Sequence, residues 1–186
     1  KSLDEDFAGT AEVATKLRQD TTDFRKNMPV IQSLASKALK PRHWEALSEL
    51  LYTPEEREEG KVINPDNTEE ELTLQTLLDL DAATHIEQVQ EITIAAEKEY
   101  NLERSMYSMI SEWNEIEYEV KAYKETKTYI VGGIDDIMTL LDDHLVKTQT
   151  MRGSPYIRPI EKECTDWEDR LKYAQTLLDE WIGCQR

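Results

Sequence analysis

The chain has 186 residues, of which 39 are acidic and 22 are basic, so its formal net charge at pH 7 is −17. This charge excludes a general nucleic-acid surface, because phosphate binding needs clustered lysine and arginine, and it argues against binding to an anionic membrane surface. Only 39% of the residues are apolar, and glycine and proline number six each. This composition favours a mainly α-helical protein over a sheet protein.

The cysteines indicate the redox compartment of the protein, and the chain ends indicate how much of it the sequence covers. Cys164 and Cys184 fall in one predicted helix, where they would lie about 30 Å apart, and a disulfide needs Cα atoms within about 7 Å. Free thiols fit a reducing compartment, and no long apolar run marks a membrane span. The chain begins with Lys1 rather than methionine and stops at Arg186 inside a predicted helix. We therefore expect a piece of a much longer chain.

Prolines divide the first part of the chain into three predicted helices. The first covers residues 6–27 and has only sparse apolar positions. Pro29 and Pro41 each favour a new helix, because proline fits the first turn, where its missing N–H costs nothing. The third of these helices carries Trp44 and Leu47 on one face.

A more acidic and irregular stretch follows. Thr53-Pro54-Glu55-Glu56 has the spacing of a capping box, with proline at the first helical position. It predicts one exposed helical turn, closed by Gly60 and followed by a loop over residues 61–67. Thr68 and Glu71 repeat the cap spacing, and residues 72–80 are predicted as a short apolar helix.

Two regular apolar series cover residues 82–120, each with helical steps of three and four. The first ends at Tyr100 and the second begins at Leu102. A jump of two residues rotates the apolar stripe, so the pattern predicts a kink, a break or a reversal near Asn101. The sequence leaves these three alternatives open.

A β-hairpin is predicted at about residues 117–131. Tyr118, Val120 and Ala122 alternate with polar residues, and Tyr129 and Val131 repeat this pattern after a short polar turn. Because an isolated two-stranded hairpin is only marginally stable in water, we expect it to lean on helices.

The next segment changes from strand to helix at Gly132-Gly133, because glycine adopts backbone angles that are costly for other residues. Beyond it the apolar period becomes that of a helix. The apolar side of this predicted helix comprises Ile134, Ile137, Met138, Leu141 and Leu145.

The last predicted helix begins at Pro159 and keeps one apolar stripe to the end of the chain. The stripe comprises Ile160, Cys164, Trp167, Leu171, Ala174, Leu178 and Trp181. One helix of a bundle is the favoured interpretation, and a coiled-coil seam is the alternative. Core packing is predicted for Trp44, Trp113, Trp167 and Trp181, with docking of a partner as the alternative for any one of them.

No residue pattern predicts catalysis, cofactor binding or metal binding. The chain lacks a phosphate loop, and it lacks the Glu-x-x-His pairs of a di-iron bundle. Asp142, Asp143 and His144 are adjacent on a predicted helix, so their side chains diverge instead of converging on one ion. His144 is predicted to be a packed histidine. We therefore assign no catalytic, cofactor-binding or metal-binding residue.

Four strings give the chain a specific resemblance. They are TYIVGGIDDIMTLLDDHLVKTQTMRGSP at 128–155, KPRHWEAL at 40–47, WNEIEYE at 113–119 and DEWIGCQR at 179–186. In this order they resemble the N-terminal part of the linker of dynein heavy chains, especially axonemal ones. The resemblance covers residues 24–186, whereas residues 53–71 depart from the family pattern by being longer and more acidic.

The resemblance implies a fold and a function. It implies that residues 1–186 are the distal part of a linker, a mechanical element that relays ATP-driven bending from the AAA+ ring to the tail of a microtubule motor. Its expected partners are the ring of the same heavy chain and the rest of the linker and tail, with no direct microtubule contact. ATP and magnesium would bind in the ring, outside this chain, and the expected location is the cytoskeleton of a cilium or flagellum.

The fold class predicted from the residues and the resemblance together is a mainly α, elongated multi-helix bundle with one small β-hairpin. The alternative function is a static spectrin-like helical scaffold or a protein-interaction module. Such a scaffold should show an internal repeat of about a hundred residues, and the sequence shows none.

Overall fold

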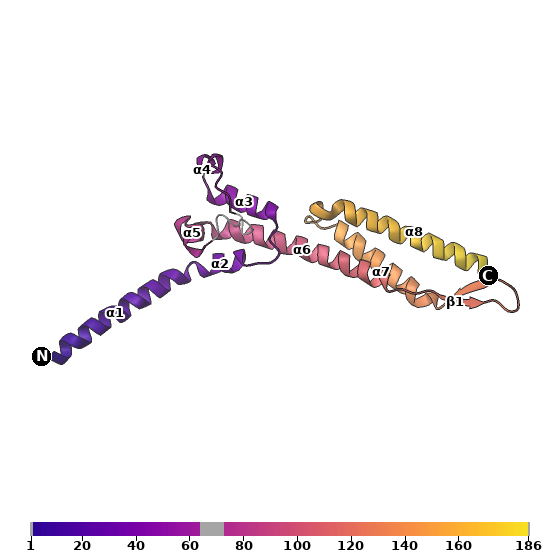
Figure 1. Cartoon of the computed structure of the whole chain (residues 1–186), viewed down its shortest axis with the longest axis horizontal. Coiled ribbons are helices and arrows are strands. Elements are labelled where there is room, and N and C mark those ends of the chain that lie inside the picture. The colour runs from indigo at the N-terminus through magenta and orange to yellow at the C-terminus, as the bar shows by residue number, and fades with distance from the viewer. Residues whose placement is uncertain (1, 64–72, 186) are drawn as a thin grey trace. The chain divides into compact units, whose positions relative to one another are not determined.

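A computed structural model describes residues 2–63 and 73–185 of the chain (Figure 1). These residues are mainly helical and contain one two-stranded antiparallel hairpin, which confirms the predicted fold class. The chain divides into two compact units, Lys1–Glu97 and Lys98–Arg186, called here the N-terminal and C-terminal units. None of the described helices is both long enough and apolar enough to cross a membrane.

The N-terminal unit begins with the three predicted helices, α1 (Ser2–Arg25), α2 (Met28–Leu34) and α3 (Pro41–Leu51). Pro29 and Pro41 lie in the first turns of α2 and α3, as predicted. The described side chains of α1, from residue 9 onward, are all exposed. The sparse apolar positions of this helix, such as Val13 and Leu17, therefore belong to no core among the described residues.

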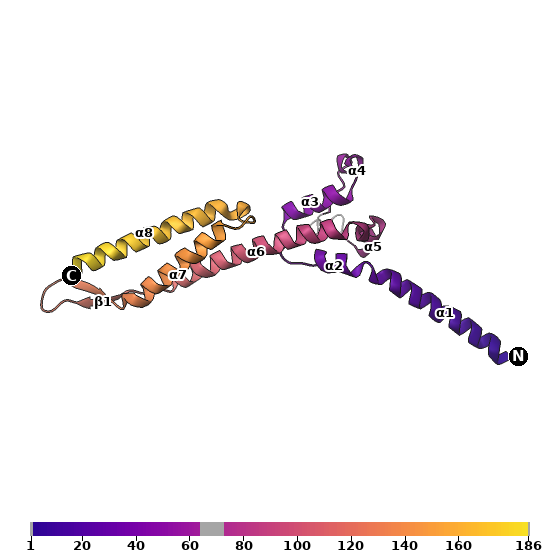
Figure 2. The ribbon, with the colours of Figure 1, turned by 180° about the vertical axis from the view of Figure 1, so that it is seen from behind.

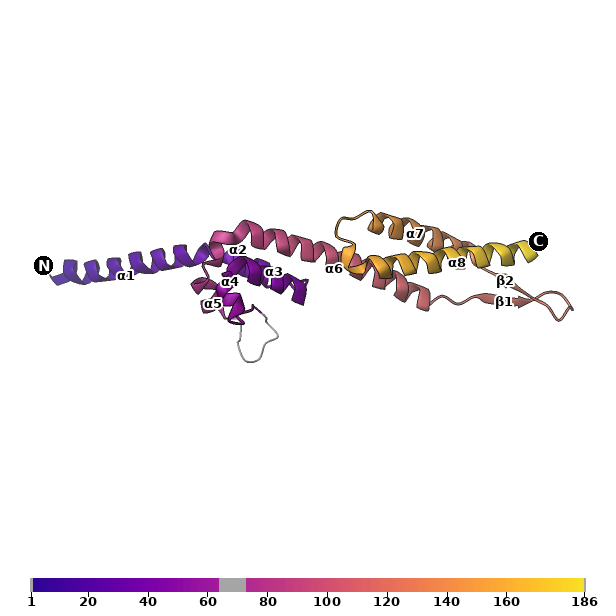
Figure 3. The ribbon, with the colours of Figure 1, turned by 90° about the horizontal axis from the view of Figure 1, so that it is seen from above.

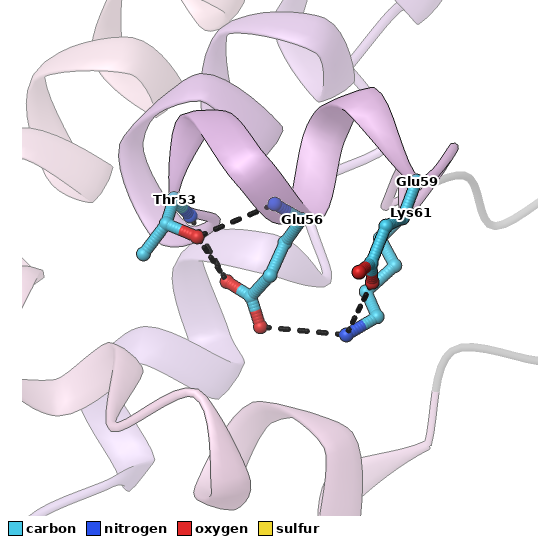
Figure 4. Close-up of polar contacts among 4 residues, drawn as sticks. All are labelled: Thr53, Glu56, Glu59 and Lys61. Carbon is cyan, nitrogen blue, oxygen red and sulfur yellow. Dashed lines mark hydrogen bonds and ion pairs between the residues drawn. The ribbon is translucent and has the colours of Figure 1, made fainter.

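The predicted capping box opens α4 (Pro54–Glu58) and is confirmed (Figure 4). Thr53 Oγ1 accepts a hydrogen bond from the Glu56 N–H at 3.4 Å, and Glu56 Oε2 accepts one from the Thr53 N–H at 3.0 Å. Lys61 Nζ lies 3.5 Å from Glu56 Oε1 and 3.7 Å from Glu59 Oε2. Gly60 ends the turn with a φ of 87°, a conformation that glycine adopts without strain.

The second predicted cap, Thr68 with Glu71, lies outside the described residues. The short helix predicted after it is α5 (Leu74–Asp79). Its described cap is Thr73, whose Oγ1 accepts a hydrogen bond from the Thr76 N–H at 3.2 Å.

The core of the N-terminal unit gathers around α3. Leu47 is completely buried, and Ser48 fixes the chain that passes beside it, since its Oγ accepts from the Ile63 N–H at 2.8 Å and donates to the Trp44 carbonyl at 2.7 Å. The buried apolar residues of this cluster are Val30, Leu34, Trp44, Leu47, Ile63, Ala82 and Val89. Ile63 lies in the segment after α4, and the others come from α2, α3, the 3₁₀ turn η1 (Ala82–His85) and the start of α6.

Helix α6 (Ile86–Asn114) continues through Asn101 without interruption. Two of the alternatives left open by the sequence, a break and a reversal, are therefore wrong. The apolar stripe shifts near the boundary between the two units, which falls between Glu97 and Lys98. Val89 belongs to the core of the N-terminal unit, and Met106 and Met109 belong to that of the C-terminal unit. The stripe changes phase because the two parts of the helix pack in different cores.

The C-terminal unit contains the predicted hairpin, formed by β1 (Glu119–Ala122) and β2 (Tyr129–Gly132). Val120 is opposite Val131, and Ala122 is opposite Tyr129. Gly133 follows with a φ of 65° and occupies the N-cap position of α7 (Ile134–Arg152). Left-handed backbone at this position allows the strand to turn directly into the helix, as the glycine pair predicts.

Helices α7 and α8 (Glu161–Gln185) lie side by side and run in opposite directions (Figures 1 and 2). The 3₁₀ turn η2 (Arg158–Ile160) precedes α8. Figure 3 shows the hairpin beside the C-terminal end of α8. The buried residues shared by α6, α7, α8 and the turn before α8 are Met106, Met109, Ile137, Leu141, Leu145, Met151, Ile157, Ile160, Cys164, Trp167, Leu171 and Leu178. This arrangement makes α8 one helix of a bundle, as favoured from the sequence.

The four tryptophans differ in their burial. Trp44 and Trp167 are buried and Trp113 packs partly buried against the core, as predicted. Core packing is wrong for Trp181, whose side chain is 44% exposed at the end of α8. Both cysteines are free and lie on α8, with Cys164 buried and Cys184 exposed.

Candidate functional site

His144, in the middle of α7, is a fully buried polar side chain of the C-terminal unit. Its side chain has no exposed surface, and it contacts two residues near the end of α6. Trp113 Nε1 lies 2.9 Å from His144 Nδ1, and His144 Nε2 lies 3.2 Å from Glu112 Oε2. The Trp113 and His144 rings meet edge to face, with centroids 6.4 Å apart. This His144–Trp113–Glu112 cluster ties α6 to α7.

The Trp113 contact fixes the protonation state of His144. An indole N–H can only donate a hydrogen bond, so His144 Nδ1 must carry a lone pair and accept. The ring proton then lies on Nε2 and is donated to Glu112. Adding a second proton at Nδ1 would set two N–H groups against each other. The cluster therefore holds a neutral histidine and suits a structural role better than proton transfer with solvent.

Burial also favours the neutral form of His144, because it lowers the pKa of the ring. Removal of the ring from water lowers the pKa below its ordinary value, and the nearby Glu112 carboxylate opposes this only in part. Lys147 lowers the pKa further, whereas Asp143 raises it slightly. As the pH falls below about 6.5, the unfolded chain binds a proton at this histidine before the folded chain does. The folded state should therefore lose stability with acidification in this range.

We expect His144→Gln to weaken the pH dependence of stability. Glutamine cannot take up a proton, so the free energy of unfolding of the variant should change less than that of the native chain between about pH 7.5 and 5.5. Urea unfolding at several pH values measures this. The other histidines and the carboxylates are common to both proteins, so the test uses the difference in unfolding free energy between the variant and the native chain. If this difference does not vary with pH, the neutral assignment of His144 is contradicted.

A second polar cluster connects α7 and α8 near the turn between them. The side chain of Glu168 is only 4% exposed and forms ion pairs with Lys172, at 2.6 Å, and with Arg152 at the end of α7. The Lys172 and Arg152 hydrogen bonds lower the pKa of Glu168. Cys164 lies nearby, and burial raises the pKa of its thiol. A thiol held in this form is a poor nucleophile, so this cluster is also structural.

The sequence assigned no catalytic, cofactor-binding or metal-binding residue, and nothing in the structure tests that assignment. Asp142 and Asp143 are exposed while His144 is buried, so these neighbours diverge as predicted. Residues 2–63 and 73–185 contain no group of three or more His, Cys, Asp or Glu side chains placed to hold a metal ion.

The packed state of His144 was predicted, but its partners were missed because they lie 31 and 32 residues away along the chain. One signal was available, because a tryptophan on an apolar stripe needs an acceptor for its N–H and a histidine on another stripe can supply one. The pairing of Glu168 with Arg152 and Lys172 was also missed. Only the i,i+4 spacing from Glu168 to Lys172 was visible in the sequence.

Comparison with known proteins identifies the family. The family model described as "Dynein heavy chain, N-terminal region 2" matches residues 1–186. The chain therefore belongs to the N-terminal region 2 family of dynein heavy chains, which confirms the resemblance seen in the sequence.

Individual relatives are axonemal dyneins. The chain is 37% identical over 181 residues to "Dynein axonemal heavy chain 1" of Mus musculus and 35% identical over 180 residues to "Dynein axonemal heavy chain 3" of Homo sapiens, each alignment covering 97% of the chain. It is 39% identical over 147 residues, or 79% of the chain, to "Dynein axonemal heavy chain 12" of Rattus norvegicus. The chain spans only 4% of the length of each of these relatives.

Proposed function

We propose that this chain is the distal part of a dynein linker and relays ATP-driven bending from the AAA+ ring to the tail of a microtubule motor. The observation that carries the proposal is the family match over residues 1–186. Since the similar heavy chains are axonemal, the proposed location is the cytoskeleton of a cilium or flagellum. The proposed partners are the ring of the same heavy chain and the rest of its linker and tail.

The packing of the C-terminal unit supports a mechanical role. Bending a helix that is packed along its length must open close-packed contacts, which resists the deformation. Buried side chains of α8 recur from Cys164 to Leu178, over most of the helix. The His144–Trp113–Glu112 cluster and the Glu168 ion pairs add polar contacts between α7 and its neighbours. A unit held in this way can transmit a load.

This role needs no catalytic group within the chain, and hydrolysis would belong to the ring of the longer protein. We expect the 186-residue chain to bind no Mg-ATP, because it lacks a phosphate loop and carries a net charge of −17. Titration calorimetry checks this expectation, and micromolar affinity would contradict it. The same charge argues against direct contact with nucleic acid, an anionic membrane or the acidic microtubule surface.

The relay is tested by softening α8 in the intact motor without removing core side chains. Tyr173 and Leu177 lie on the outer side of α8 and are 67% and 50% exposed. Changing both to glycine costs about 1 kcal/mol of helix propensity each, relative to alanine. We expect microtubule gliding velocity to fall while microtubule-stimulated ATPase activity is retained.

The matched control is the double change of Tyr173 and Leu177 to alanine, which removes the same side chains and keeps the helix propensity. Its gliding velocity should stay near that of the native motor. If the glycine and alanine pairs slow gliding equally, the lost side chains matter and the stiffness of α8 does not. If gliding is native with the glycine pair, the static scaffold becomes the better interpretation.

A further inference from the structure

The outer edge of strand β2 carries a backbone N–H and a C=O that the hairpin itself leaves unpaired. Tyr123 N–H donates to the Thr128 carbonyl at 2.9 Å, which makes these two residues a hydrogen-bonded pair. In an antiparallel ladder such pairs alternate with pairs whose backbone groups point outward. Val131, opposite Val120, falls in the second class. Its N–H and C=O therefore point away from β1.

Gln185, in the last turn of α8, meets both of these groups with its side-chain amide. The amide nitrogen donates to the Val131 carbonyl at 3.2 Å, and the amide oxygen accepts from the Val131 N–H at 3.1 Å. The same oxygen accepts from Trp181 Nε1 at 2.9 Å. The reversed orientation of the amide would set donors against donors and acceptors against acceptors, so the hydrogen bonds decide its direction.

These two bonds match the pair that a residue of a neighbouring strand would form. Val131 is 5% exposed, so leaving its backbone groups unpaired would be costly. The same interaction explains the position of Trp181, which is partly exposed while its N–H is used to orient the Gln185 amide.

We propose that Gln185 is a positioning residue whose amide replaces a third strand and latches the hairpin to the C-terminal end of α8, with Trp181 orienting that amide. The latch depends on the last turn of α8 being wound, because Trp181 and Gln185 are brought together by one helical turn. Unwinding that turn releases the edge of β2. The proposal concerns the C-terminal unit alone and does not depend on the proposed motor function.

Gly183 weakens the helical turn that contains Trp181 and Gln185. It lies inside the helix between Trp181 and Gln185, where glycine is less favourable than alanine. A Cβ added at this position would meet no atom within 4 Å. Gly183→Ala should therefore close the latch more firmly, and it provides a test in the direction opposite to loss of the amide.

The test is amide hydrogen exchange, measured by NMR on the 186-residue chain. In Gln185→Ala, exchange at the Val131 N–H should become about fivefold faster, which is the effect of losing one ordinary hydrogen bond. Exchange at the Tyr123 N–H, which is bonded within the hairpin, should not change. In Gly183→Ala, exchange at Val131 should become about fivefold slower.

The control is Gln175→Ala on the same helix, where the side-chain amide donates to Asp142 at 3.3 Å and does not touch the hairpin. It should leave the Val131 N–H unaffected. Unchanged exchange at Val131 in Gln185→Ala would overturn the proposal. Equal acceleration at Tyr123 would also overturn it, because Gln185 would then stabilise the hairpin as a whole without positioning it.

Discussion

Leu171→Ala should lower the free energy of unfolding of the C-terminal unit by about 2–5 kcal/mol, the range found for removal of large apolar side chains from packed cores. Leu171 is 2% exposed and lies in the core shared by α6, α7 and α8. The expected loss combines the apolar surface that is no longer buried with the cavity that remains. Protection of α8 amides against hydrogen exchange measures the change in this unit directly.

The matched control for this prediction is Leu177→Ala, which makes the same chemical change on the same helix at a site that is 50% exposed. Its effect should be within about 0.5 kcal/mol of zero, as for most surface substitutions. Similar losses in the two variants would mean that the change acts through the helix itself. Native protection of α8 in Leu171→Ala would show that α8 does not depend on this core.

Leu47→Ala should have a comparable effect in the N-terminal unit, again about 2–5 kcal/mol. Leu47 has no exposed surface and lies in the cluster that also contains Trp44 and Ile63. Ser48 fixes the backbone of Ile63 beside it, so the surroundings have little freedom to collapse into the space left by the leucine. Protection of α3 amides should fall accordingly.

Leu74→Ala is the control for Leu47→Ala, because Leu74 lies in α5 of the same unit and is 42% exposed. It should leave the protection of α3 nearly unchanged. Undiminished protection of α3 in Leu47→Ala would contradict the assignment of this core. Equal losses of protection in the two variants would also contradict it.

Much of the fold could be predicted because its signals are local. Pro29 and Pro41 set the starts of two helices through the geometry of their own rings. Thr53 and Glu56 cap each other within one turn, and Gly133 changes strand to helix by its own backbone angle. None of these effects depends on which distant segment packs nearby, so the sequence alone was sufficient.

The errors arose where distant packing decides the outcome. Near Asn101 the sequence left a kink, a break and a reversal open, and the break and the reversal are wrong, because the apolar stripe of a continuous helix can change phase when the core that it faces changes. At Trp181 the apolar spacing predicted burial, but the side chain lies past the last buried residue of α8, Leu178. The His144–Trp113–Glu112 cluster joins two helices across a hairpin and could not be found from spacing.

The two cysteines of α8 make the chain suitable for selective chemical labelling. Cys164 is buried, and the raised pKa of its thiol disfavours the thiolate that reacts with maleimides and iodoacetamides. Cys184 is exposed in the last turn of the same helix. A fluorophore would therefore attach at Cys184 without any engineered residue, next to Gln185. Its emission would report the local environment at the end of α8 in the otherwise native chain.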